Sequence, residues 1–144
     1  MKVFTDKFIN RFLFHRNWTL EIVNLRLYKN YMKKDDCIFC KISSGEIPSY
    51  KIWENDEFFA ILDIFPNTKG MTLVIPKEHF DSYTFDMPDD VYTRFLLSAK
   101  ELGKILDERF GVQRTALVME GMGVNHAHIK LYPLHGLGKD FKAV

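Results

Sequence analysis

Two short stretches of the chain carry side chains that could do chemistry, and the first is residues 125–133, NHAHIKLYP. Two histidines stand one residue apart, and a lysine follows at the same spacing. A neutral imidazole is both a nucleophile and a metal ligand near pH 7. Attack on a phosphate needs a nucleophile and nearby positive charge, because charge on the phosphoryl oxygens must be offset. The alternatives are a metal site and an ordinary strand with a solvated polar face.

The second stretch is CIFC, in which Cys37 and Cys40 are the only cysteines of the chain. Two cysteines this close make a poor structural cross-link and are better placed to hold a metal or to do redox chemistry. We therefore expect a reducing, cytoplasmic setting. A thioredoxin-like redox role has less support, because no βαβ pattern surrounds CIFC. A reduced pair without a metal is the remaining alternative.

The histidines need an element to position them, and residues 127–132 are expected to form a strand. Side chains alternate along a strand, so His126, His128 and Lys130 should share one face. The opposite face should pack into the core. Its residues are Ala127, Ile129 and Leu131.

The segments upstream predict a strand at 57–65, a turn at 66–70 and a second strand at 71–76, which together read as a hairpin. Another strand is expected at 115–119. Between them lies a helix, for which Asp86 is a plausible N-cap. Its apolar residues recur every three or four positions, and Gly111 ends it. These residues are Val91, Phe95, Ala99, Leu102, Leu106 and Phe110. This order of elements predicts an α+β fold with an antiparallel sheet and one main flanking helix.

Composition fits a globular protein, with 47 % apolar and 27 % charged residues among 144. The net charge of +1 argues against nucleic acid as a partner, and no apolar run approaches the roughly 20 residues of a membrane span. Residues 1–31 are basic and differ from the rest. They read as an N-terminal extension (an appended helix or a weak transit peptide), or as a start placed too early, with Met32 the true start. Residues 32–144 make a domain without them.

Taken together, the stretches at 37–80 and 126–133 resemble the histidine-triad (HIT) family of nucleotide hydrolases and nucleotidyl transferases. The family motif is His-φ-His-φ-His-φ-φ, where φ is apolar, and HAHIKLY matches it except at the third histidine. The resemblance implies a HIT-like α+β fold, a nucleotide substrate and, by analogy, a homodimer.

The resemblance also implies roles for single residues. His128 matches the histidine that attacks the α-phosphorus and forms a nucleotidyl-histidine intermediate. Asp63 matches the carboxylate that binds the ribose hydroxyls; the alternative is a turn or strand-end aspartate. Four apolar residues are candidates for the base pocket, and each could instead be plain core. They are Ile38, Phe39, Phe59 and Ile61.

A structural zinc ion follows from the same resemblance. A closed zinc site takes four Cys or His ligands in a tetrahedron. The zinc-containing branch of the family uses the CxxC pair, a histidine after the second strand and the first histidine of the motif. These match Cys37, Cys40, His79 and His126.

The chain departs from the family pattern at two places. Lys130 replaces the third histidine; a lysine keeps positive charge but is a poor proton donor near pH 7. Met119 stands where the family has an asparagine, and Asn125 is the obvious polar substitute for a phosphate contact. Two further readings therefore stay open: a nucleotide-binding module without turnover, and a zinc-stabilised scaffold for protein contact.

Overall fold

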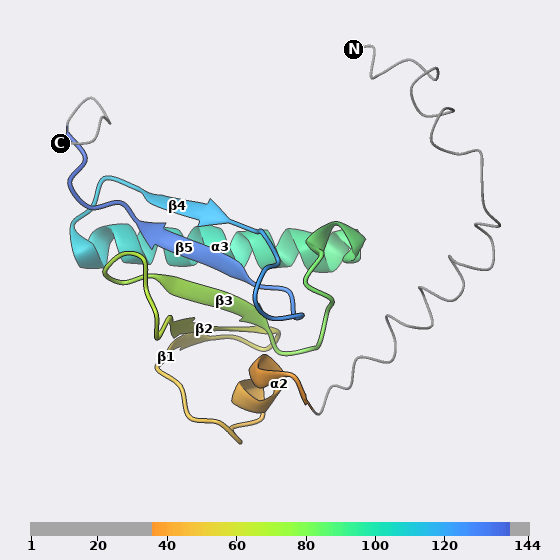
Figure 1. Ribbon diagram of the computed structural model, residues 1–144. Helices are drawn as coiled ribbons and strands as arrows, with labels where there is room; N and C mark the ends of the chain where they lie inside the picture. The colour runs from red at the N-terminus through yellow and green to blue at the C-terminus, as the bar shows by residue number, and fades with distance from the viewer. Residues whose placement is uncertain (1–35, 139–144) are drawn as a thin grey trace, which may run out of the picture. The chain divides into compact units, whose positions relative to one another are not determined.

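A five-stranded sheet organises the part of the chain that the computed structural model describes, residues 36–138 (Figure 1). Its order is β1-β2-β3-β5-β4, and every neighbouring pair is antiparallel. The expected α+β fold is confirmed. The predicted extension at 1–31 lies outside the described residues. Within them, no helix is both long and apolar enough to cross a membrane.

The predicted hairpin is formed by β2 (Phe58–Leu62) and β3 (Thr72–Pro76). The first strand is shorter than the expected 57–65, because the chain turns at Asp63. The carboxylate Oδ1 of Asp63 accepts a hydrogen bond from the backbone N–H of Phe65 at 2.8 Å. Such a turn draws the backbone out of the ladder.

The predicted helix is α3 (Asp89–Phe110), and Gly111 caps its C-terminus at φ 61°, as expected. The Asp86 N-cap prediction is wrong: Pro88 occupies the N-cap, and Asp86 ends a 3-10 helix, η2 (Thr84–Asp86). Proline's fixed φ suits the start of a helix. The helix buries its apolar stripe against one face of the sheet, and burial of each such side chain is worth about 1.5–3 kcal/mol. The stripe comprises Phe95, Ala99, Leu102 and Leu106.

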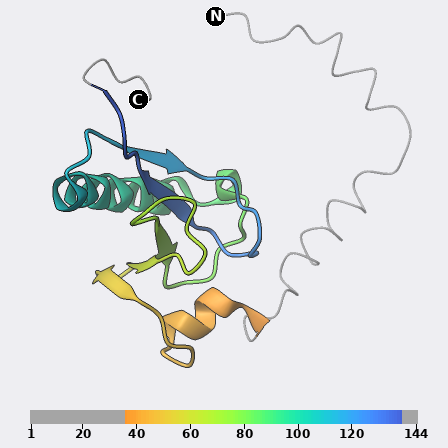
Figure 2. The same cartoon turned by 60° about the vertical axis from the view of Figure 1, so that its left-hand side comes forward.

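The other face of the sheet is covered by a short helix that the sequence pattern did not predict, α2 (Ile38–Ser43). Figure 2 shows α2 and α3 separated by the strands. Phe39 and Ile42 of α2 pack on the sheet residues that point away from α3. These sheet residues are Phe59, Ile61, Leu73 and Ile75, and Met71, just before β3, joins them. The edge strand β1 (Lys51–Glu54) was also not predicted.

Two strands complete the sheet, β4 (Thr115–Val118) and β5 (Ile129–Pro133). The strand expected at 127–132 therefore begins two residues later. The backbone N–H of Ala127 donates to the Phe80 carbonyl at 2.8 Å, so this residue bonds to the segment after β3 instead of continuing the ladder. The predicted core face is nevertheless confirmed, since Ala127, Ile129 and Leu131 are at most 1 % exposed.

Candidate functional site

His126 lies at the centre of a cluster of sulfur and nitrogen atoms. Its ring is fully buried, and its Nε2–H donates to the backbone carbonyl of Pro76 at 2.9 Å. A carbonyl can only accept, so the other nitrogen, Nδ1, carries the lone pair. Nδ1 lies 3.3 Å from Sγ of Cys37 and 3.6 Å from Sγ of Cys40. The ring is thus oriented as a ligand by a main-chain group.

His79 completes the cluster from the segment that follows β3. Its Nδ1 lies 3.3 Å from Sγ of Cys40, and its ring centroid is 4.9 Å from that of His126. Helix α2 brings the two sulfurs together, because Cys37 is its N-cap and Cys40 follows within one turn. The sequence therefore predicted which four residues meet here.

The geometry of these four residues fits a tetrahedral zinc ion. The N···S distances of 3.3 and 3.6 Å fall within the roughly 3.3–3.8 Å that zinc bond lengths set between tetrahedral ligands, and all four ligand atoms lie within 4.8 Å of one another. Burial lowers the pKa of His126 to about 4, so the ring is neutral at pH 7. A neutral imidazole and two thiols that can ionise are the donors that zinc prefers. A bound ion would hold α2 against the sheet.

His128 is arranged in the opposite way to His126. It is 3 % exposed, and its Nδ1–H donates to the His126 carbonyl at 2.8 Å. Its lone pair is therefore on Nε2. Burial lowers the pKa of His128, and the charge on Lys130 acts in the same direction, against the hydrogen bond to the carbonyl and the nearby carboxylates. The result is a neutral imidazole with an available nucleophilic nitrogen near pH 7.

Lys130 forms an ion pair with a residue that the sequence analysis missed, Glu120. The ammonium Nζ donates to Oε1 of Glu120, and the lysine side chain is 19 % exposed. The hydrogen bond to Glu120 raises the pKa of Lys130. The strand register contained the signal, because Val118 of β4 pairs with Lys130 of β5, and Glu120 follows two residues later. Lys130 is thus a shielded cation, not an isolated one.

Asp63 follows the last residue of β2, close enough to influence the pKa values of His128 and Lys130. Its charge is among the smaller factors that raise the pKa values of His128 and Lys130. One of its oxygens already accepts the Phe65 N–H. A carboxylate has about four acceptor positions, so hydrogen bonding to a sugar diol would be compatible with that turn.

Asn125 holds the loop that precedes His126. Its side-chain Oδ1 accepts the backbone N–H of Ser82 at 3.1 Å. Gly121 packs against the same segment: at φ 67°, a Cβ there would lie 2.5 Å from the Ser82 carbonyl oxygen. A phosphate contact by Asn125 would use the donating amide nitrogen, because phosphate oxygens accept.

Of the candidates for the base pocket, Phe39 has the strongest link to the histidines. Its ring meets those of His126 and His128 edge-on, with centroids 5.8 and 5.4 Å apart. Ile38 is 44 % exposed on α2, which suits a residue on the outer wall of a pocket. Phe59 and Ile61 are 1 % and 5 % exposed and belong to the core under α2, so packing accounts for them.

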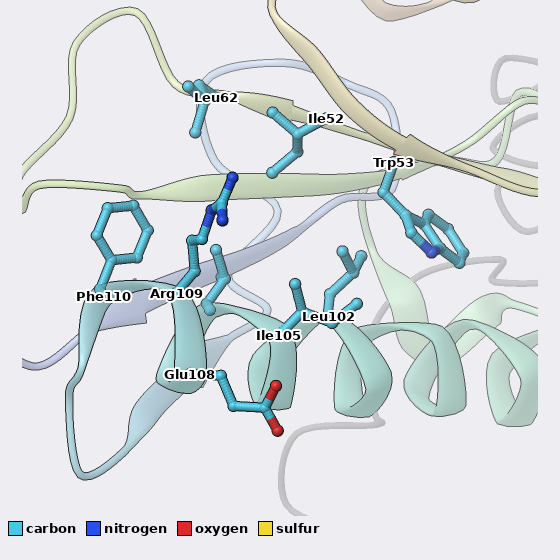
Figure 3. Close-up of a pocket in the computed structure, with 9 residues that line it drawn as sticks. Ile52, Trp53, Leu62, Leu102, Ile105, Glu108, Arg109 and Phe110 are labelled. Atoms are coloured by element: carbon cyan, nitrogen blue, oxygen red, sulfur yellow. The ribbon is translucent and has the colours of Figure 1, made fainter.

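A separate cavity of about 710 Å³ lies on the α3 side of the sheet. Figure 3 shows its walls, formed by β1, the end of β2 and the C-terminal half of α3. Trp53, Ile105 and Phe110 are among its lining residues. His128 and the thiol cluster instead meet Phe39 of α2, on the other face. This cavity is therefore not part of the histidine site.

Comparison with known proteins gives a consistent result. The HIT domain model matches residues 44–140. An uncharacterised HIT-like protein of Methanocaldococcus jannaschii is 38 % identical over 102 residues, which cover 67 % of this chain and 78 % of that protein. An adenosine 5′-monophosphoramidase of Saccharomyces cerevisiae is 38 % identical over 98 residues, 67 % of this chain and 61 % of that one.

A solved structure agrees with the fold. A zinc-bound histidine triad family protein from Mycobacterium smegmatis superposes with a TM-score of 0.66 at 28 % identity. The match covers 76 % of this chain and 82 % of that one.

Proposed function

The chain belongs to the HIT family, and we propose that it is a zinc-containing hydrolase or nucleotidyl transferase that cleaves a nucleoside 5′-phosphate derivative at the α-phosphate. The observation that carries the proposal is the state of His128. Its Nδ1 is engaged by a backbone carbonyl, so its Nε2 is the nucleophilic nitrogen. The phosphoramidase activity in the name of the yeast relative supports a phosphoramidase or dinucleoside polyphosphate hydrolase class.

In the proposed reaction, the Nε2 lone pair of His128 forms a bond to the α-phosphorus, and the bond to the leaving group breaks. An oxygen of water or of another acceptor then bonds to the phosphorus and gives up its proton to solvent, while the N–P bond breaks and its electron pair returns to Nε2. The Nδ1–H···O=C bond keeps the ring oriented through both steps.

The surrounding residues have supporting roles in this proposal. Lys130 and the amide nitrogen of Asn125 offset charge on the phosphate oxygens. Asp63 accepts the ribose hydroxyls, and Phe39 and Ile38 provide apolar surface for the base.

The zinc ion is proposed as structural. It would be held by Cys37, Cys40, His79 and His126. Four protein ligands fill the tetrahedron, so no coordination position remains for substrate. Bound zinc would fix the N-terminus of α2, and with it Phe39, beside His128.

A homodimer in a reducing, cytoplasmic environment completes the proposal. Strand β4 lies at the edge of the sheet, and Leu117 on it is 43 % exposed. An edge strand of this kind offers unpaired backbone groups to a second copy. Light scattering during size-exclusion chromatography tests the dimer; a single species at the monomer mass would contradict it.

The decisive experiment follows the covalent intermediate. The protein is incubated with adenosine 5′-phosphoramidate and, separately, with diadenosine triphosphate, and is examined by intact and peptide mass spectrometry under non-acidic conditions. We expect an adenylyl adduct on the peptide that contains His128, formed by wild type and absent from His128→Asn. The absence of both adduct and turnover would refute the proposed reaction.

A second candidate function is a nucleotide-binding module without turnover. The pairing of Lys130 with Glu120 favours it, because the carboxylate of Glu120 reduces the net positive charge that faces the phosphate. Binding of AMP measured by calorimetry, combined with no adduct and no hydrolysis, would select this function.

A further inference from the structure

The ion pair of Lys130 and Glu120 affects which substrates the site can cleave. This inference rests on the proposed function. Lys130 of β5 lies two residues after His128 and close enough for its charge to act on that ring, and the carboxylate of Glu120 holds its ammonium. The side chains are 19 % and 35 % exposed, so the pair is partly withdrawn from water. The cation beside the nucleophile therefore has a fixed partner.

A cation held in this way can offset charge, but it is a poor acid. An effective general acid has a pKa near the working pH. Lysine starts well above it, and the hydrogen bond to Glu120 raises the pKa of Lys130 further. Lys130 would therefore stabilise the phosphoryl oxygens while keeping its own protons.

The other imidazoles of the described region are engaged elsewhere. His126 and His79 face the two sulfurs. His135 lies beside Phe110, with ring centroids 5.9 Å apart, and its Nε2 donates to the Lys69 carbonyl. Among residues 36–138, no imidazole apart from the nucleophile is thus placed to protonate a leaving group.

We propose that Lys130 and Glu120 make this site selective for nucleoside 5′-phosphoric anhydrides over nucleoside 5′-phosphoramidates. In an anhydride, the P–O bond breaks, the electron pair stays on the departing phosphate oxygen, and no proton is required. A phosphate monoester has its second pKa at about 6, so the departing anion is stable at neutral pH. An amine must instead gain a proton as the P–N bond breaks. Glu120 acts as a positioning residue through Lys130.

The test uses substrates that share the adenosine 5′-phosphoryl group. These are diadenosine triphosphate, the 4-nitrophenyl ester of AMP and adenosine 5′-phosphoramidate. The ester has an acidic leaving group without phosphate charge, so it separates leaving-group acidity from charge recognition. We expect wild type to cleave the anhydride and the ester with kcat/KM at least about 100-fold above that for the phosphoramidate.

Three variants isolate the cause of this preference. Lys130→His supplies a donor of suitable pKa and should shift the ratio toward the phosphoramidate by about 100-fold. Lys130→Gln removes charge without adding a donor, so kcat/KM should fall for all three substrates while their ratio stays within a few-fold. Glu120→Gln should shift the ratio in the same direction as Lys130→His, but less, because Lys130 then releases its proton more readily. Zinc content serves as the control for folding.

Equal cleavage of all three substrates by wild type, or a preference for the phosphoramidate, would overturn the inference. So would a ratio that Lys130→His leaves unchanged. Absence of the adenylyl adduct with every substrate would refute the proposed function itself, and the inference with it. The adduct measurement thus distinguishes the two failures.

Discussion

His126 and His128 stand two residues apart and are both buried, yet they present opposite ring nitrogens. The first donates from Nε2 to Pro76 and turns Nδ1 toward the sulfurs. The second donates from Nδ1 to the carbonyl of the first and keeps its lone pair on Nε2. The same residue type therefore has a ligand geometry in one place and a nucleophile geometry in the other.

In each histidine, the main-chain carbonyl that accepts the ring N–H determines whether the ring presents a ligand geometry or a nucleophile geometry. Each carbonyl can only accept a hydrogen bond, so it decides which nitrogen carries the proton. No side chain is needed as the orienting partner. Loss of His128 should therefore remove turnover and leave zinc binding, whereas loss of His126 should remove zinc binding and leave the nucleophile. The predictions below test this separation, from the largest expected effect to the smallest.

The largest effect is expected for the proposed nucleophile, His128. His128→Asn should lower kcat/KM for the best substrate by about 10³-fold or more, because the covalent step is lost. Zinc content and the unfolding midpoint should stay close to those of wild type. His135→Asn is the matched control, since His135 is exposed, and its turnover should be unchanged. Loss of zinc from the His128→Asn protein would contradict the separation of the two histidines' roles.

The complementary change removes a proposed zinc ligand, His126. His126→Asn should abolish stoichiometric zinc and lower the free energy of unfolding by about 4 kcal/mol, the linkage expected for a ligand present at about 1,000 times its Kd. Cys37→Ser should have the same effect while retaining the imidazole. Denaturant unfolding and elemental analysis provide the measurements. Full zinc occupancy in both variants would exclude the proposed ligand set.

A smaller effect is expected from the loop that leads to both histidines. Gly121→Ala places a Cβ 2.5 Å from the Ser82 carbonyl oxygen, whereas the same change at Gly123 meets nothing within 4 Å. Both residues have positive φ, so both variants bear backbone strain, of about 1 kcal/mol or more. The extra loss in Gly121→Ala isolates the steric contact, and we expect about 1–2 kcal/mol more destabilisation with a higher KM. Equal stabilities would show that the loop moves aside.

The smallest effect is expected from the N-terminal extension. Both histidine sites lie within residues 36–138, so a chain that starts at Met32 should keep zinc binding and turnover within about two-fold of the full chain. Parallel assays of the two chains test this. N-terminal mass analysis of the native protein then shows which form occurs.

Much of the fold could be predicted from the sequence because its signals are periodic. The apolar repeat from Val91 to Phe110 and the capping glycine defined α3. The four residues of the proposed metal site were recognised by their types and by the family resemblance. Their meeting point could not be derived from spacing, since Cys37 and His126 are 89 residues apart.

The features that were missed have local causes. Helix α2 has six residues, too few to show a helical period. Strand β1 is an edge strand with mostly exposed residues, so it lacks alternation. Glu120 lies beyond the end of β4, and only the register with β5 reveals its partner. Asp86 was a reasonable N-cap by type, but the chain forms a 3-10 turn before the helix begins.

A zinc ion held by Cys37, Cys40, His79 and His126 would also close a loop of the chain. Cys37 and His126 are 89 residues apart, and a cross-link over about 100 residues can reduce the entropy of the unfolded chain by an amount worth about 4–5 kcal/mol. Without a bound ion, α2 would depend mainly on Phe39 and Ile42 for its attachment. Amide hydrogens in this helix should then exchange with solvent before those of β3 and α3. Metal supply would thus set the order in which the domain opens.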